Sequence, residues 1–89
     1  MIIGEVTGNL WATRKDDNLN GFKFLVVRKL DHKGEPTNNV MIAVDSVGAG
    51  IGDQVLIVSG SSARYVLDDN KAPIDATIVG IVDSLEISN

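Results

Sequence analysis

The sequence contains no cysteine among its 89 residues, so neither disulfide bonds nor thiolate metal ligands can reinforce the fold. A chain of this length forms one domain, whose core buries only about 60–65% of the surface that the unfolded chain exposes. Contact with a partner subunit would therefore add substantially to its stability.

Long apolar segments are absent as well. No stretch approaches the ~20 apolar residues that cross a bilayer, and residues 1–5 lack the basic segment and apolar run of a signal peptide. We therefore expect a soluble cytoplasmic protein with no membrane partner.

Basic and aromatic residues are scarce. The formal net charge is −4, the eight Lys and Arg residues are scattered, and the aromatic residues are Trp11, Phe22, Phe24 and Tyr65. Nucleic-acid binding depends on basic residues that neutralise phosphates and, for single strands, on exposed rings that stack on bases. The composition therefore disfavours a nucleic-acid partner.

Alternation of apolar and polar residues predicts short strands. Residues 2–13 alternate with period two and are expected to form a strand with one face in a core, with Trp11 on the opposite, polar face. One helical turn, capped by Ser61 or Ser62, is compatible with residues 63–67. The other expected strands, separated by turn-rich segments, are residues 22–30, 40–44, 54–58 and part of 74–83.

This pattern predicts an all-β fold: a small five-stranded OB-like closed barrel with at most one short helical turn, forming a single domain over residues 1–89. A barrel interior accepts only alternate side chains, yet the strand at 22–30 is apolar on both faces. We therefore expect Trp11, Leu25 and Val27 to make outward apolar contacts. Because contiguous apolar surface marks an interaction site, the barrel is predicted to assemble into a ring through its wall.

The sequence shows no pattern typical of an enzyme, a cofactor site or a metal site. Residues 16–21 resemble the start of a calcium loop, but the twelfth position, which must supply a carboxylate, is Val27. His32 is the only histidine, so the serines within 59–62 have no second candidate base, and no ligand set for a metal is complete. We therefore expect turn and capping roles for these residues, no catalytic residue, no cofactor and no metal.

Residues 45–64 carry the most distinctive pattern in the chain. The run Asp-Ser-Val-Gly-Ala-Gly-Ile-Gly-Asp-Gln-Val-Leu, followed by Ser-Gly-Ser-Ser-Ala-Arg, is similar to the signature of the bacterial microcompartment vertex proteins, the EutN/CcmL family. The opening Gly-Glu-Val-Thr-Gly at 4–8 and the closing Pro-Ile-Asp-Ala-Thr-Ile-Val-Gly at 73–80 also resemble family segments. The resemblance therefore covers most of the chain.

The resemblance implies a structural shell protein, not an enzyme. A family member forms a homopentamer that caps the vertices of a polyhedral shell in the bacterial cytoplasm, next to hexameric shell proteins. The Ser-Gly-Ser-Ser-Ala-Arg element looks closer to metabolosomes of the ethanolamine, propanediol or glycyl-radical type than to carboxysomes. An OB-like nucleic-acid-binding domain and a co-chaperonin-like ring protein are the alternatives.

The two small-residue turns are the predicted subunit interface or pore. Glycines allow the backbones of neighbouring subunits to approach closely, and Ser61, Ser62 and Arg64 can donate hydrogen bonds across the boundary. An intrachain salt bridge is the alternative role for Arg64. Trp11 is expected to contact a neighbouring subunit or a facing shell tile. The predicted interface residues are Gly48, Ala49, Gly50, Gly52, Gly60, Ser61, Ser62, Ala63 and Arg64.

Overall fold

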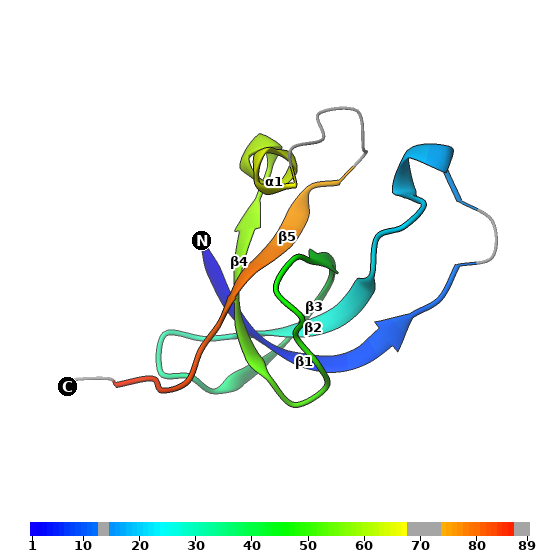
Figure 1. Ribbon diagram of the computed structural model, residues 1–89. Coiled ribbons are helices and arrows are strands. Elements are labelled where there is room, and N and C mark those ends of the chain that lie inside the picture. Colours follow the sequence, from blue (N-terminus) through cyan, green and yellow to red (C-terminus); the bar gives the residue numbers. More distant parts are fainter. Residues whose placement is uncertain (13–14, 68–73, 87–89) are drawn as a thin grey trace.

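Five strands close into a barrel that carries one short α-helix (Figure 1). This computed structural model describes residues 1–12, 15–67 and 74–86. The strands follow the order β1-β2-β3-β5-β4 around the barrel, which confirms the predicted five-stranded closed barrel. The elements are β1 (Ile2–Leu10), a 3₁₀ turn η1 (Asp17–Leu19), β2 (Phe24–Leu30), β3 (Pro36–Asp45), β4 (Gln54–Ser59), α1 (Ser61–Val66) and β5 (Ala76–Ile81).

One seam of the barrel differs from the others. The pairs β1–β2, β2–β3, β1–β4 and β4–β5 are antiparallel. The barrel closes between β3 and β5 in parallel, and among the described residues this seam consists of two pairs, Val44 with Thr77 and Asp45 with Ile78. This short parallel seam completes the wall.

Helix α1 covers one end of the barrel (Figure 1). Ala63 on the helix is fully buried and forms a cluster with Val44 and Ile74, and the Thr77 hydroxyl donates a hydrogen bond to the Ala63 carbonyl (2.9 Å). The N-cap residue is Gly60, which has φ 69° and no side chain. The capping role expected for Ser61 or Ser62 is therefore wrong, because both serines lie within the first helical turn.

A β-bulge at Thr7 reverses the faces of β1. Val6 pairs with Val27, but Gly8 pairs with the residue directly before Val27 on β2, so Thr7 has no partner there. One extra residue in a strand sends all later side chains to the opposite face. Leu10, which uninterrupted alternation places in the core with Val6, is 40% exposed instead.

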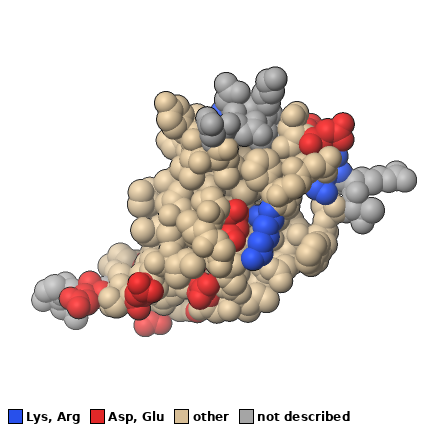
Figure 2. Space-filling model, viewed as in Figure 1, with Lys and Arg blue, Asp and Glu red and all other residues tan. Residues whose placement is uncertain are grey.

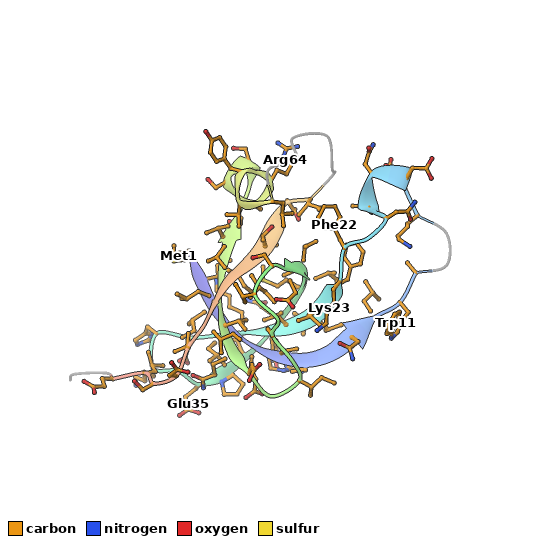
Figure 3. The ribbon with its side chains drawn as sticks, in the orientation of Figure 1. Met1, Trp11, Phe22, Lys23, Glu35 and Arg64 are labelled. Carbon is orange, nitrogen blue, oxygen red and sulfur yellow. The ribbon has the colours of Figure 1, made fainter. Side chains whose placement is uncertain are left out.

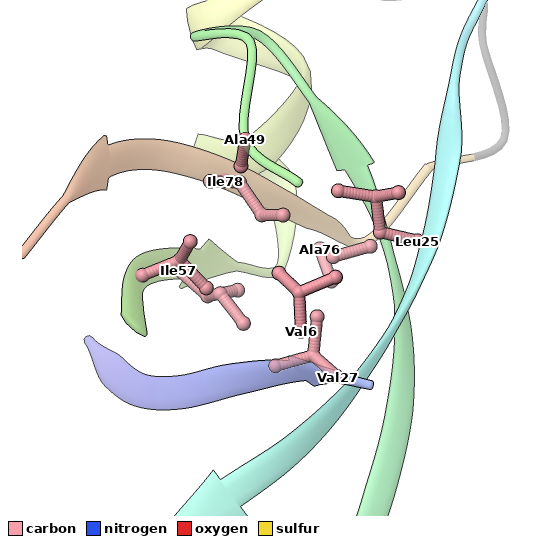
Figure 4. Close-up of a cluster of buried hydrophobic side chains, with 9 residues drawn as sticks. Val6, Leu25, Val27, Ala49, Ile57, Ala76 and Ile78 are labelled. Carbon is pink, nitrogen blue, oxygen red and sulfur yellow. The ribbon is translucent and has the colours of Figure 1, made fainter. Parts of the chain in front are cut away.

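The main core fills the barrel interior (Figure 4). Within it Leu25 and Val27 are both 0% exposed, so their predicted outward orientation is wrong. Because β2 is apolar on both faces, alternation alone permits either orientation, and the pairing of Val27 with inward-facing Val6 decides it. Phe24 and Val26 take the outer face and are half-buried. The core residues are Val6, Leu25, Val27, Ala43, Ala49, Val55, Ile57, Ala76 and Ile78.

A tight turn joins β2 to β3. The Asp31 carboxylate accepts hydrogen bonds from the backbone N–H groups of Lys33 (2.8 Å) and Glu35 (3.0 Å). These bonds, that of Glu35 first, hold the pKa of the Asp31 carboxyl below its usual value, because they favour the charged form. Strand β3 begins directly afterwards at Pro36, earlier than the predicted residue 40.

Candidate functional site

The loop between β3 and β4, residues 46–53, is fixed at its first half by charged side chains. The Asp45 carboxylate, whose side chain is 4% exposed, accepts hydrogen bonds from the backbone N–H groups of Val47 (3.0 Å) and Gly48 (3.1 Å). Lys23 reaches across from the chain just before β2, and its Nζ donates to the Ala49 carbonyl (2.9 Å) and lies 3.8 Å from Asp45 Oδ2. The start of the loop is thereby tied to a neighbouring strand.

The second half of this loop is tied to β1. The Gly50 N–H donates to Asp53 Oδ2 (2.8 Å), and Val6 exchanges backbone hydrogen bonds with Gly52 and Asp53 (both 2.9 Å). Ala49, in the middle of the loop, is only 1% exposed and belongs to the core. A loop anchored at both ends and through its centre has one defined shape.

Glycine occupies the three positions of this loop for different reasons. Gly48 (φ +82°) and Gly52 (φ +94°) adopt the left-handed conformation, which residues with a Cβ rarely adopt, so the turn itself explains them. Gly50 has no such conformation, and a Cβ there would meet only Asp53 Oδ2, at 4.0 Å. Nothing within the described chain therefore requires glycine at position 50, and a close approach by a neighbouring subunit stays the prediction for it.

An apolar groove of about 430 Å³, the Trp11 groove, lies beside this loop. Trp11 and Ile51 are 89% and 65% exposed, and Trp11, Phe22 and Lys23 lie on the same side of the barrel (Figure 3). Trp11 points out of the barrel as predicted, and its contact with a neighbour stays a prediction. The groove is lined by Asn9, Leu10, Trp11, Ala12, Lys15, Gly21, Phe22, Lys23, Phe24, Gly50 and Ile51.

The second predicted turn lies at the start of α1. Ser61 and Ser62 are exposed, and Gly60, Ser61 and Arg64 border a shallow depression with Asp75. Arg64 is half-buried, and none of the described carboxylates forms a salt bridge with it. The hydrogen bonds that these residues were expected to make across a subunit boundary stay predictions.

Two alanines do not belong in the predicted interface. Ala49 and Ala63 are 1% and 0% exposed within their own chain. A residue without exposed surface offers none to a partner, so their assignment to the interface is wrong. Both alanines instead anchor the two turns in the barrel.

The candidate chemical groups are dispersed. Residues 16–21 contain the η1 turn, before which Asp16 Oδ1 accepts a hydrogen bond from the backbone N–H of Asn18 (2.8 Å). His32 is exposed on the β2–β3 turn. Among the described residues no three His, Cys, Asp or Glu side chains come together as metal ligands. No helix in the described ranges is long and apolar enough to cross a membrane.

Acidic side chains dominate the charged surface in one view. Figure 2 shows them mainly along the lower rim of this face, with only a few separated basic side chains and no continuous basic band. Such a face lacks the clustered positive charge that binds a phosphate backbone.

Comparison with known proteins decides the family. The family model described as "Ethanolamine utilisation protein EutN/carboxysome" matches residues 1–83. The chain belongs to the EutN/CcmL family. One relative is the shell vertex protein PduN of Salmonella typhimurium, which is 46% identical over 96% of this chain and 98% of PduN. Another is the carboxysome shell vertex protein CcmL of Synechococcus elongatus, which is 42% identical over 100% of this chain and 90% of CcmL.

Solved EutN/CcmL structures share the fold. The pentameric microcompartment shell protein GrpN from Rhodospirillum rubrum has a TM-score of 0.90 at 42% identity, over 99% of this chain and 100% of GrpN. CcmL of Gloeobacter violaceus has a TM-score of 0.94 at 38% identity, over 100% of this chain and 92% of CcmL. These relatives are named as shell proteins, so the nucleic-acid-binding and co-chaperonin alternatives are not favoured.

Lys23 and the two phenylalanines of the groove were missing from the predicted site. No local signal marks Lys23, because its partners Asp45 and Ala49 are more than twenty residues away in the sequence. The outer position of Phe24 follows from the pairing of Val27 with Val6, which turns Leu25 and Val27 inward, and this pairing has no local signal in the sequence.

Proposed function

We propose that this protein is a structural shell protein that forms a homopentamer and caps the vertices of a bacterial microcompartment shell. The match over residues 1–83 to a family whose relatives are named as shell vertex proteins carries this proposal. A relative with the same fold is described as pentameric. Ring assembly explains the apolar side chains on the outside of the barrel.

The outer wall itself supports assembly. Trp11, Tyr65 and Ile51 are 89%, 90% and 65% exposed, and Val40 on β3 is 51% exposed. A small domain gains stability when apolar surface of this kind is removed from water, by roughly 25 cal/mol for each Å² buried. A ring formed by one repeated contact can shelter such side chains on every copy.

The role proposed for the pentamer is geometric. A flat layer of hexagonal tiles cannot close, and units with five-fold symmetry at the corners allow it to do so. The partners of the pentamer are then hexameric shell proteins, its place is the shell in the bacterial cytoplasm, and it has no catalytic function. The acidic surface and the dispersed chemical groups agree with this role.

The enclosed pathway is proposed from the second turn. Its Ser-Gly-Ser-Ser-Ala-Arg sequence at 59–64 favours a metabolosome of the ethanolamine, propanediol or glycyl-radical type. Identities of 46% to PduN and 42% to CcmL are too similar to separate the two kinds of compartment.

Two measurements test the proposal. Light scattering of the purified chain should give five times its 9.5 kDa mass, whereas a monomer or a seven-fold ring would contradict the vertex assignment. Co-expression with a hexameric shell protein should yield closed polyhedral particles in electron micrographs. Omitting this protein should leave open sheets, tubes or shells with missing corners, and particles that close equally well without it would count against the proposal.

A further inference from the structure

A short arm follows β5 and leaves the barrel. The Val82 N–H donates to the Gln54 carbonyl (2.7 Å), and beyond it residues 83–86 are exposed and take no part in a helix or strand. Figure 1 shows this segment running away from the barrel wall. Leu85, in the middle of the arm, is 43% exposed. The arm, residues 82–86, thus offers exposed backbone groups and one apolar side chain to a binding partner beside the barrel.

The groove beside the glycine loop has the features that such an arm needs. Strand β1 pairs with β4 only over Ile2–Glu5, so in the described structure its later part, Gly8–Leu10, has β2 on one side and an open edge on the other. An extended peptide can add to an open strand edge and place alternate side chains in adjacent pockets. Here the pocket beside that part of β1 is the apolar groove that contains Trp11, Phe22 and Phe24.

The charges of the two surfaces are complementary. Lys15 and Lys23 border the groove, while the arm carries Asp83 and Glu86, all with exposed surface. Lys15 Nζ bonds to the Ala12 carbonyl (3.1 Å), which keeps its positive charge at the end of β1 beside the groove. In a protein of net charge −4, two lysines at one apolar groove favour an acidic segment with an apolar side chain as its ligand.

The arm cannot reach the groove of its own chain. Its residues lie beside Lys33, Gly34 and Gly52–Gln54, on the opposite side of the barrel from Trp11 (Figures 1 and 3). A contact between two different surfaces on opposite sides of one chain is heterologous, and its repetition closes a ring when the rotation fits.

We propose that the arm of each copy binds in the Trp11 groove of the next copy, with Leu85 in the groove and Asp83 and Glu86 facing Lys15 and Lys23. This contact rests on the proposed homopentamer, because it identifies the surfaces through which the ring closes. It also gives a reason for glycine at position 50, since backbone rather than a side chain borders the bound arm there.

The absence of cysteine allows a direct test. In the double variant Ala12→Cys/Ser84→Cys, both positions are exposed, and one lies in the groove and the other on the arm. Treatment with a short bis-maleimide cross-linker should produce a ladder of covalent species up to five chains on a denaturing gel. Each single variant alone should stay monomeric on that gel, and a mixture of the two should stop at dimers. Asn38→Cys/Ser84→Cys, with an exposed position on β3, is the matched control and should give no ladder.

The outcomes separate this contact from the proposed function. A wild-type chain that is monomeric by light scattering overturns both. A wild-type and variant pentamer that gives no ladder overturns the arm contact alone, as does a cross-link confined within single chains. A ladder from the control pair equal to that of the test pair would also reject the assignment.

Discussion

The Nζ atom of Lys23 lies 2.9 Å from the carbonyl oxygen of Ala49 and links the start of β2 to the centre of the glycine-rich loop. The same ammonium group lies 3.8 Å from Asp45 Oδ2, and Asp45 holds the beginning of that loop through two backbone N–H groups. A single exposed cation thereby connects the wall of the barrel to the loop that borders the Trp11 groove.

Replacing Lys23 with methionine should loosen this loop. The variant keeps the aliphatic stem and loses the hydrogen bond and the ion pair, so we expect the free energy of unfolding to fall by about 1 kcal/mol. Urea unfolding at one fixed protein concentration measures this, because assembly makes apparent stability depend on concentration. Lys29→Met, at an exposed position on β2, is the control. Equal losses for the two variants would contradict a special role for Lys23.

Gly50→Ala should separate folding from assembly. Because a Cβ at Gly50 meets only Asp53 Oδ2 at 4.0 Å, the unfolding free energy of the isolated chain should change by less than about 0.5 kcal/mol. We expect the pentamer to dissociate at higher protein concentration than the wild type, as measured by light scattering over a dilution series. Unchanged dissociation would show that no neighbour approaches this backbone.

Gly4→Ala is the contrasting variant for that experiment. A Cβ at Gly4 would overlap Val27 Cγ1 and lie 3.0 Å from the Arg28 carbonyl oxygen. Overpacking of this kind costs about 1–3 kcal/mol, so this variant should lose folding stability itself. The two alanine substitutions should therefore differ in circular dichroism melting curves.

Arg64→Ala tests the second turn. If Arg64 donates hydrogen bonds to a neighbour, its removal should weaken the ring, and light scattering at low protein concentration should show smaller species. Lys29→Ala, at an exposed residue on β2, should keep the wild-type mass. A pentamer that survives dilution equally well in both variants would remove Arg64 from the interface.

Asp31 should make stability depend on pH in the acid range. Its folded-state pKa lies below the ordinary value of 3.8, because backbone N–H groups of Glu35 and Lys33 bond to the charged form. The stabilisation is fully present above about pH 4, and it is lost as the pH falls through 3.8 toward the folded-state pKa. Asp31→Asn should therefore melt below the wild type at pH 7, and the difference should shrink below pH 3.8. A difference that stays constant down to the lowest pH would contradict this cause.

Alternation and turn residues predicted the architecture because they report local preferences. Strand β4 was predicted at 54–58 and lies at Gln54–Ser59, since its β-branched run is bounded by an Asp and a Gly-Ser turn. The faces of β2 could not be predicted, because an apolar residue stands at nearly every position and only the pairing with β1 selects the inner set. The bulge at Thr7 that shifts this pairing has no local signal.

In the two turns of the site, too, local features could be predicted from the sequence and contacts with distant residues could not. Gly48 and Gly52 could be predicted as turn glycines from the sequence, and their left-handed backbones agree. Their neighbour Ala49 could not be assigned to the core, because its burial depends on contacts with distant strands. Lys23 was missed for the same reason, since its role depends entirely on partners brought near it by folding.

The parallel seam between β3 and β5 is the part of the barrel wall that we expect to open first. Two residue pairs hold it, whereas β3 is joined to β2 by six paired positions from Phe24–Val44 to Leu30–Pro36. Amide groups next to that seam should exchange with deuterium sooner than those of the β2–β3 hairpin, because partial opening there breaks few hydrogen bonds. The barrel can therefore bend at the β3–β5 seam while its antiparallel strand pairs keep their curvature.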